Sequence, residues 1–187
     1  MRHLLSPWWA TLHNGSPVKY APQMATYQRS QIAILAGAKE VIAEVGSYES
    51  LMNDIAERAE VSRATIYNHF ADREELMNAL LASEVERLII IATSAATRAE
   101  ALYQLSRNIS EDLALAKMVE TDRDQITALI TITDHPLWIA IHRAAAQVFG
   151  GDENSVGLIL RWLIAQVTSP LTAVQSKIQA DRLTSLL

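Results

Sequence analysis

Residues 62–69, with the sequence SRATIYNH, form a run of mostly short, hydrogen-bonding side chains. Serine, threonine, asparagine, tyrosine and histidine side chains both donate and accept hydrogen bonds, and Arg63 adds a cation with several N–H donors. Ile66 and Phe70 are apolar and four residues apart, which is the spacing of one face of an α-helix. The segment therefore predicts a short helix that is anchored by Ile66 and Phe70 and presents a polar face to a partner.

A second helix, earlier in the chain, would position this segment. Ser50 is expected to cap a helix that runs to about Arg58, whose inward residues recur every four positions, at Leu51, Ile55 and Ala59. After a tight turn, Ser62 offers an N-cap oxygen to the second helix. Two helices joined in this way form a helix-turn-helix, whose second helix can lie in the major groove of DNA.

The residues around this helix-turn-helix resemble the tetracycline-repressor (TetR) family of bacterial transcriptional regulators. The resemblance covers roughly residues 30 to 80, and its elements are Gly46, Ser50, Asp54-Ile55-Ala56, Ala59, Val61-Ser62, Thr65-Ile66-Tyr67, His69-Phe70 and Glu75-Leu76. Two positions depart from the family pattern, because Glu60 replaces the usual turn glycine and Arg73 replaces the usual lysine. A residue other than glycine held at positive φ costs about 1 kcal/mol or more, so Glu60 could reshape the turn.

The resemblance implies a set of DNA contacts, made by Ser62, Arg63, Ala64, Thr65, Tyr67, Asn68, His69 and Arg73. Arg63 and Thr65 would reach base edges and Ala64 a thymine methyl group, while phosphates would be bound by Ser62, Tyr67, His69 and Arg73. It also implies a ligand-responsive regulator, and specifically a repressor that binds a palindromic operator as a homodimer. The alternative is a helical dimeric interaction module whose helix-turn-helix does not bind DNA. Two features favour this alternative: Glu60 in the turn, and the excess of acidic residues in the part of the chain that would bind DNA.

The composition narrows the function classes. The 187 residues carry a formal net charge of −5 and no cysteine, which excludes disulfides and thiolate metal sites and argues against binding nucleic acid by bulk charge. Residues 1–80 also contain more Asp and Glu than Lys and Arg, so any positive surface must be local, at Arg63, Arg73, Lys39 and the N-terminus. No apolar run is long enough to cross a bilayer, and we expect a soluble, cytoplasmic protein with no membrane segment.

The expected architecture is all-α, with an N-terminal three-helix helix-turn-helix head on a C-terminal antiparallel helical body. Residues 1–27 read as an extension, because they contain three prolines and no acidic residue. This extension could enter the minor groove as a basic arm, or could pack loosely against a neighbouring helix. Residues 28–75 form the predicted DNA-binding domain, and residues 76–187 the predicted ligand-binding and dimerisation domain.

Helical periodicity assigns most of the remaining chain. In the head, a helix over residues 28–45 would turn Ile32, Leu35, Ala36, Lys39 and Val41-Ile42 inward and end at Gly46. In the body, helices are expected over residues 73–93, 99–119, 123–133, 137–149 and 152–168, with a last helix after Pro170. Asp72 would cap the first of these helices, Pro136 would start the fourth, and Asp152 lies where the fifth begins.

The segment 156–167, VGLILRWLIAQV, is apolar around most of its circumference. A helix of this kind needs burial on two sides, and a second copy of the chain could supply one of them. We therefore expect a homodimer that forms through residues 155–187, as the family resemblance also implies. The alternative is that this segment is the central helix of a monomeric bundle.

Candidates for a ligand pocket come from aromatic and polar residues of the body, namely Tyr103, Trp138, His142 and Phe149. They suggest a small hydrophobic effector, although the same residues would also serve as plain core, with His142 bonded to a core carbonyl. His135 and His142 lack a third ligand nearby, so no metal is expected. No catalytic or cofactor-binding motif is present, so neither an enzyme nor a cofactor is expected.

Overall fold

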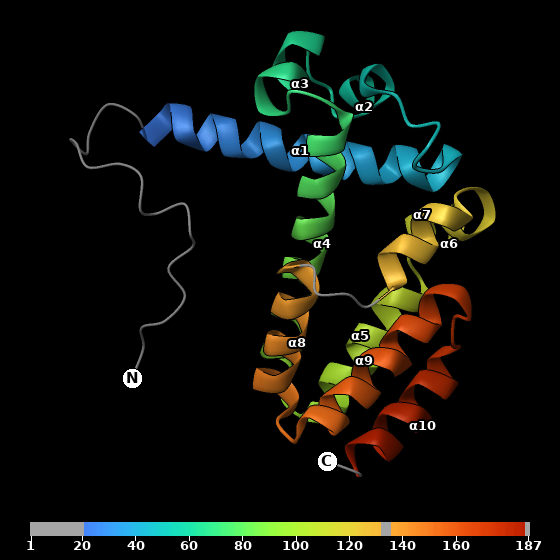
Figure 1. Cartoon of the computed structure of the whole chain (residues 1–187). Helices are drawn as coiled ribbons and strands as arrows, with labels where there is room; N and C mark the ends of the chain where they lie inside the picture. The colour runs from blue at the N-terminus through green and yellow to red at the C-terminus, as the bar shows by residue number, and fades with distance from the viewer. Residues whose placement is uncertain (1–20, 132–135, 186–187) are drawn as a thin grey trace.

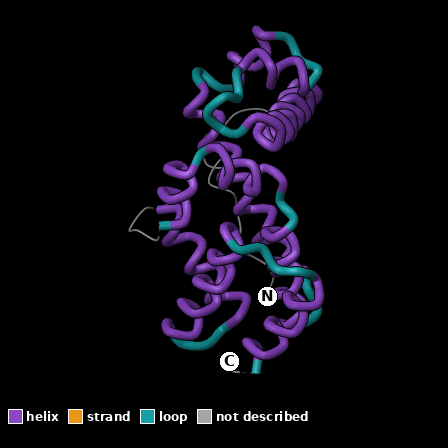
Figure 2. The backbone as a smooth tube through the Cα atoms, turned by 90° about the vertical axis from the view of Figure 1, so that its right-hand side faces the viewer, coloured by secondary structure: helices purple, strands orange, loops and turns teal. Residues whose placement is uncertain are grey.

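The computed structural model describes residues 21–131 and 136–185, and within these ranges the chain forms ten α-helices and no β-strand. Figures 1 and 2 show a smaller head above a larger body, which confirms the predicted all-α architecture with an N-terminal helix-turn-helix head. None of the helices in the described ranges is both long enough and apolar enough to span a bilayer.

The head contains three complete helices and the beginning of a fourth, in the order α1 (Ala21–Val45), α2 (Met52–Arg58), α3 (Arg63–His69) and α4 (Arg73–Ser94). In Figure 1, α1 lies across the molecule beneath α2 and α3, and α4 descends from the head into the body. The head core combines all four helices, with Ile34 of α1, Ile55 of α2, Ile66 of α3 and Leu76 of α4 fully buried. The three helices of the helix-turn-helix unit thus share one apolar core.

Helix α1 differs from the predicted helix in length and in register. It begins at Ala21, inside the segment that was predicted to be an extension, because Pro22 stands in the first turn, where a missing N–H costs no helical hydrogen bond. Its buried stripe is Ile34, Ala38, Val41 and Ile42, whereas the predicted inward residue Ile32 is 68% exposed. The predictions that concern residues 1–20 lie outside the described residues.

Two of the three predicted N-caps are confirmed and one is wrong. Ser62 and Asp72 each accept a hydrogen bond from the backbone amide three residues further on, and so does Asp152, where a helix was predicted to begin. Ser50, in contrast, does not cap α2, which begins one residue later with Leu51 at the N-cap position. The Ser50 hydroxyl is fully buried and donates to the carbonyl of Ser47, so it stabilises the loop before the helix. Leu51, predicted to face inward, is 58% exposed.

The body consists of the rest of α4 and six further helices, α5 (Arg98–Ser110), α6 (Leu113–Thr121), α7 (Arg123–Ile130), α8 (Pro136–Phe149), α9 (Glu153–Thr168) and α10 (Ala173–Thr184). The sequence predicts one helix over residues 99–119, but the structure divides it into α5 and α6. The side chain of Asp112 accepts hydrogen bonds from the amides of Ala114 and Leu115 and so starts a new helix. Pro136 begins α8, as predicted.

Helix α9 is covered largely by its own body. Val156, Ile159, Leu160 and Leu163 are buried in the body core, and Leu163 retains only 7% of its exposure. A glutamate at position 163 would therefore disrupt the folded body rather than an interface between two chains. The side of α9 that remains exposed carries Leu158, with Arg161 and Ala165 on the following turns.

Two sets of polar contacts attach α1 and the loop after it to the body. Lys39 of α1 forms ion pairs with Glu84 of α4, at 2.5 Å, and with Asp112 at the start of α6, at 2.6 Å. Beyond the C-terminal end of α1, the buried carboxylate of Asp122 accepts hydrogen bonds from the backbone amides of Ser47, at 2.6 Å, and Tyr48, at 3.2 Å. The head is therefore joined to the body at both ends of the C-terminal half of α1.

Candidate nucleic-acid interface and ligand cavity

The turn between α2 and α3 keeps the geometry that usually requires glycine. Glu60 has a φ of 54°, and its amide donates to the carbonyl of Glu57, while the amide of Val61 donates to the carbonyl of Ala56. These two hydrogen bonds form the Schellman arrangement, in which the residue after the C-cap adopts the left-handed conformation. Glu60 does not reshape the turn, so the backbone of Glu60 carries strain.

The strain at Glu60 gives a direct prediction. Glu60→Gly should raise the free energy of unfolding by about 1 kcal/mol, or roughly 2 to 4 °C in Tm for a chain of this length, because glycine adopts positive φ without a steric cost. Thermal melts would measure the change. Glu60→Gln is the control, because it removes the charge but keeps the Cβ atom, and it should melt like the natural protein. A Gly variant that melts lower would contradict the strained geometry.

The exposed side of α3 carries Arg63, Ala64, Tyr67 and Asn68, while Ile66 is fully buried on the opposite side. These four positions repeat at helical spacing and form a single face. The guanidinium of Arg63 lies 5.9 Å from the centre of the Tyr67 ring, a cation–π contact between successive turns. The helix thus presents hydrogen-bonding side chains on one side while its other side is held by the head core.

Three of the predicted contact residues also have structural roles. The hydroxyl of Ser62 caps α3 and lies 2.8 Å from the hydroxyl of Thr65, which is half-buried. Arg73 is half-buried too, and its Nε donates to the carbonyl of Ser50 at 3.1 Å, which joins α4 to the loop before α2. The predicted contacts of Ser62, Thr65 and Arg73 with DNA stay predictions.

His69, at the end of α3, packs on a residue that sequence reasoning missed. Its ring centre is 4.0 Å from that of Tyr27 in the first part of α1. The Nδ1 atom of His69 is buried without a hydrogen-bond partner among the described residues, and burial lowers the pKa of the imidazole below its ordinary value. Tyr27 lies seven residues before Ile34, so continuing the buried stripe of α1 by two turns would have indicated it.

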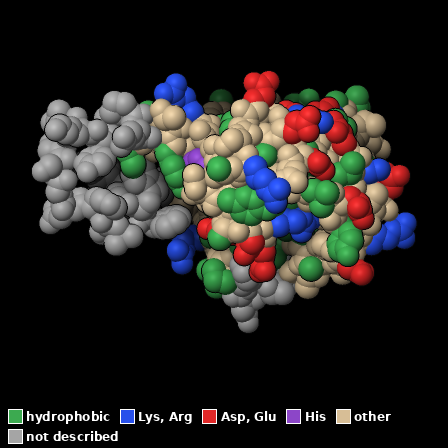
Figure 3. All heavy atoms as spheres, turned by 90° about the horizontal axis from the view of Figure 1, so that it is seen from above, with side chains coloured by type: hydrophobic (Ala, Val, Ile, Leu, Met, Phe, Trp, Pro, Cys, Tyr) green, Lys and Arg blue, Asp and Glu red, His purple; other side chains and the backbone are tan. Residues whose placement is uncertain are grey.

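Two cations of the head, Lys39 and Arg58, are already paired with carboxylates. Lys39, which was expected to add to a positive surface, is instead held between Glu84 and Asp112, because α1 packs on the body at that point. Arg58 pairs with Glu40 and Glu44 of α1, and its hydrogen bond lowers the pKa of Glu44. Figure 3, which views the molecule from the side of α2 and α3, shows basic side chains interspersed with acidic and uncharged ones among the described residues. Recognition by this face must therefore depend on individual side chains rather than on bulk charge.

A cavity of about 470 Å³ lies in the body between α4, α5, α6, α7, α8 and α9. This volume falls in the range of roughly 300 to 1,000 Å³ that is usual for pockets that bind small molecules. Most of the lining is apolar, for example Leu81, Leu88, Leu129, Ile141 and Leu163. The cavity also reaches the underside of the head, where Lys39 and Ser47 line it.

The structure divides the four predicted pocket residues. Trp138 and Phe149 line the cavity, whereas Tyr103 and His142 lie outside its lining. The reason is helical register, since one residue corresponds to about 100° of rotation. On α8 the lining stripe passes through residues 137, 138, 141, 144, 145, 148 and 149, which leaves His142 at its edge. On α5 it passes through residues 105, 108 and 109, so Tyr103 packs on the body core instead.

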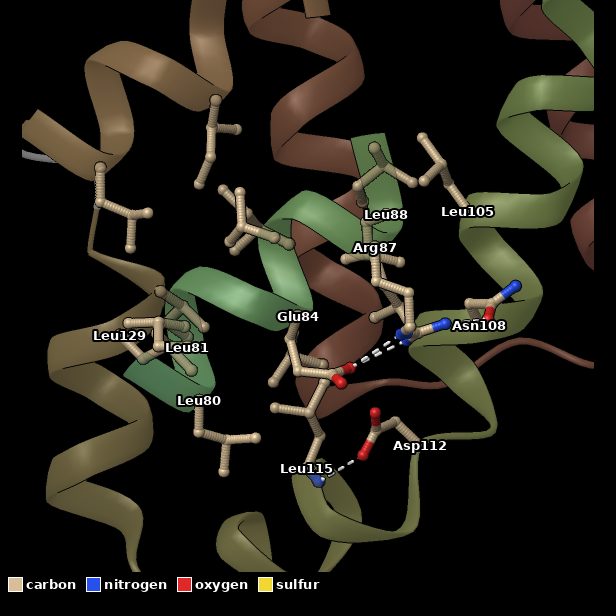
Figure 4. A pocket seen from close by; sticks show the side chains of 18 of the residues that line it. Leu80, Leu81, Glu84, Arg87, Leu88, Leu105, Asn108, Asp112, Leu115 and Leu129 are labelled. Carbon is tan, nitrogen blue, oxygen red and sulfur yellow. Dashed lines mark hydrogen bonds and ion pairs between the residues drawn. The ribbon is translucent and has the colours of Figure 1, made fainter. Parts of the chain in front are cut away.

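Residues that sequence reasoning missed form the polar part of the lining. Glu84, Arg87, Asn108 and Asp112 project toward one another at the cavity (Figure 4). Their spacing along α4 and α5 fits a helical surface exposed to water equally well, so the sequence gives no signal for them. Metal ligands do not gather here or elsewhere in residues 21–131 and 136–185, and His135 lies outside the described residues.

Comparison with known proteins identifies the class of domain that the head forms. Residues 34–80 match the sequence model described as bacterial regulatory proteins of the tetR family. These are the residues that build α2, α3, the turn at Glu60 and most of the head core. The match agrees with the resemblance found in the sequence, and it identifies the head as a DNA-binding domain of the tetR type. No curated protein matches the chain.

Solved structures of TetR-family regulators share the fold over more than four fifths of the chain. A regulator from Rhodococcus sp. RHA1 is 17% identical, with a TM-score of 0.54 over 84% of this chain and 95% of its own. The repressor AlkX from Dietzia sp. strain DQ12-45-1b is 16% identical, with a TM-score of 0.56 over 83% and 95%. The regulator FadR from Bacillus subtilis, solved in complex with stearoyl-CoA, is 20% identical, with a TM-score of 0.53 over 83% and 96%. At these identities the similarity shows the fold alone.

Proposed function

We propose that this protein is a ligand-responsive transcriptional repressor that binds a palindromic operator as a homodimer. The observation that carries the proposal is the exposed face of α3, where Arg63, Ala64, Tyr67 and Asn68 project from a helix anchored by Ile66 and Phe70. In a dimer, two such helices would be about 34 Å apart, or a multiple of that distance, to enter successive major grooves. The Dietzia relative, described as a repressor, supports this direction of regulation.

Ligand response is supported by the cavity below the head. The cavity is mostly apolar and touches both Lys39 of α1 and residues of α4, the helix that continues from the head into the body. A small, mainly hydrophobic effector bound there would contact both parts of the protein. A ligand that binds one orientation of the head better than another would shift the population toward that orientation and so change operator affinity.

DNA binding can be tested with mobility shifts on the DNA that flanks the gene, at low salt. Arg63→Ala should lower the affinity for a specific fragment by about tenfold per recognition helix, because a bidentate contact between arginine and guanine contributes about 1 to 3 kcal/mol. Arg143→Ala, an exposed arginine on α8, is the control and should bind as the natural protein does. If no fragment binds at low salt, the alternative of a DNA-incompetent interaction module is correct.

The outer surface of α9 and α10 supports the homodimer. The two helices lie side by side in Figure 1, and the indole Nε1 of Trp162 donates to Gln179 at 2.7 Å. Their exposed sides carry Leu158 on α9 and Val174 and Ile178 on α10, which are large apolar residues with no cover in one chain. A second copy of this surface would bury them around a two-fold axis.

The dimer gives a prediction for Ile178→Glu. Ile178 is 47% exposed, so the variant should fold, but a dimer interface would bury the new carboxylate without a partner. We expect the natural protein to sediment as a dimer and the variant as a monomer. Ile139→Glu is the control, because Ile139 on α8 is also half exposed, at 50%, and lies away from this surface. If Ile178→Glu remains a dimer, the proposed interface is wrong.

A further inference from the structure

The cavity has a polar corner, formed by Lys39, Glu84, Arg87, Asn108 and Asp112, and the polar residues elsewhere in its lining are Ser47, Arg73, Asn78 and Gln125. These residues come from α1, α4, α5 and the turn that starts α6, and they meet although they are far apart in the sequence. Figure 4 shows the corner residues of α4, α5 and that turn facing one another on one side of the pocket, with leucine side chains around the rest. The remainder of the lining is predominantly apolar.

The charges of the polar corner cancel. Glu84 Oε2 accepts hydrogen bonds from Lys39 Nζ at 2.5 Å and from Arg87 Nε and Nη2 at 3.1 and 2.9 Å. Asp112 Oδ2 pairs with Lys39 Nζ at 2.6 Å. Arg87 Nη1 also donates to Asn108 Oδ1 at 2.8 Å. Two cations therefore face two carboxylates beside an apolar space, and the corner has no net charge to offer to an ionic ligand.

The corner still has hydrogen-bonding capacity. Among the described residues, Glu84 Oε1 accepts no hydrogen bond, whereas Oε2 of the same carboxylate accepts three. A guanidinium has five N–H groups, and the contacts of Arg87 with Glu84 and Asn108 use three of them. One acceptor and two spare donors thus lie close together. A hydroxyl or a primary amide, which both donates and accepts, matches this set.

We propose that the effector of this protein is an uncharged, mainly apolar molecule with one hydroxyl or amide group, which binds at the polar corner. This inference rests on the proposed ligand-responsive function and specifies its ligand class. The apolar part of the effector fills the leucine-rich part of the cavity of about 470 Å³. The polar group donates to Glu84 and accepts from Arg87, so neither partner loses its existing ion pair.

The balanced charges of the polar corner disfavour the binding of an ionic ligand there. A carboxylate in the corner would add a third negative charge to two cations, and an ammonium would add a third positive charge to two carboxylates. Either excess charge would have no counter-ion left in the corner, because each existing charge is already paired. Selectivity then comes from the penalty on ions as much as from the hydrogen bonds to the neutral group. The two isosteric variants Asn108→Asp and Glu84→Gln change the net charge of the corner in opposite directions.

The test uses four probes with one carbon chain: octanol, octanoate, octylammonium and octane, titrated into the full-length protein by calorimetry. We expect octanol to bind about tenfold or more tightly than the other three. Asn108→Asp should shift the preference toward octylammonium, and Glu84→Gln should shift it toward octanoate, in variants whose melting curves confirm folding. Octanoate or octane binding as tightly as octanol, no binding by any probe, or an unchanged preference in both folded variants would overturn the proposal.

These measurements need no DNA, so a failure of the proposed ligand class can be distinguished from a failure of the proposed repressor function. Preferential binding of octanol together with a failure to shift any DNA fragment would leave the ligand class standing and remove the repressor. DNA binding without any preference for octanol would do the reverse.

Discussion

Gly46→Ala should destabilise the protein by about 3 kcal/mol, which corresponds to a fall of roughly 6 to 12 °C in Tm for a chain of this length. Gly46 ends α1 with a φ of 88°, where an alanine is strained. An added Cβ would also lie 2.3 Å from Thr121 Oγ1 and 2.7 Å from Asp122 Oδ2. The loop after α1 would have to move away from the body, so the variant should lose the attachment at Asp122 as well.

Gly150→Ala is the matched control for Gly46→Ala. Gly150 also has positive φ, at 64°, but its added Cβ would meet only the guanidinium of Arg98, which is the end of a flexible side chain. The control should lose about 1 kcal/mol, the cost of the backbone conformation alone. Urea unfolding of both variants would measure the difference. Equal losses would show that the contact of Gly46 with the body does not constrain the head.

Asp122→Ala should cost about 3 kcal/mol, since it leaves the amides of Ser47 and Tyr48 without their acceptor. Ser47 is buried, so water cannot replace the lost oxygen at its amide without opening the loop. Denaturant melts would give the loss, and protection of the Ser47 amide from hydrogen exchange should fall in parallel.

Two further variants serve as controls for Asp122→Ala. Asp122→Asn keeps one acceptor oxygen and should lose about half as much free energy of unfolding as Asp122→Ala. Asp124→Ala removes an exposed carboxylate from the first turn of the same helix, α7, and should stay within about 0.5 kcal/mol of the natural protein. If Asp122→Ala unfolds like Asp124→Ala, the two hydrogen bonds do not stabilise the protein.

Features that depend on a few neighbouring residues could be predicted from the sequence. Ser62 and Asp72 were identified as N-caps because the cap and the amide that it satisfies are only three residues apart. The burial of Ile66 and Phe70 followed from their spacing. The recognition helix, its anchor and its exposed face are all local properties of that kind.

Features that depend on distant partners could not be predicted. Ser50 has the chemistry of a cap, but its place in a buried loop under Arg73 gives it another role. Lys39 has the chemistry of a phosphate contact, but α1 packs it against Asp112. His142 was predicted to line the pocket, but it follows the lining residue Ile141 by one position on α8, and this shift places it at the edge of the lining. In each case the residue type indicated which interactions were possible, and the packing of distant parts of the chain determined which of them forms.

The attachments between head and body determine how the head can move. Lys39 and the Ser47–Tyr48 loop attach α1 to the body, and α6 packs on α1 with Ala114 in the head core. Helix α4 crosses α1 in Figure 1 and continues into the body. Turning α3 relative to the body therefore requires several of these contacts to shift together. Because Lys39, Ser47 and α4 all border the cavity, a molecule bound there would touch all of these attachments at once.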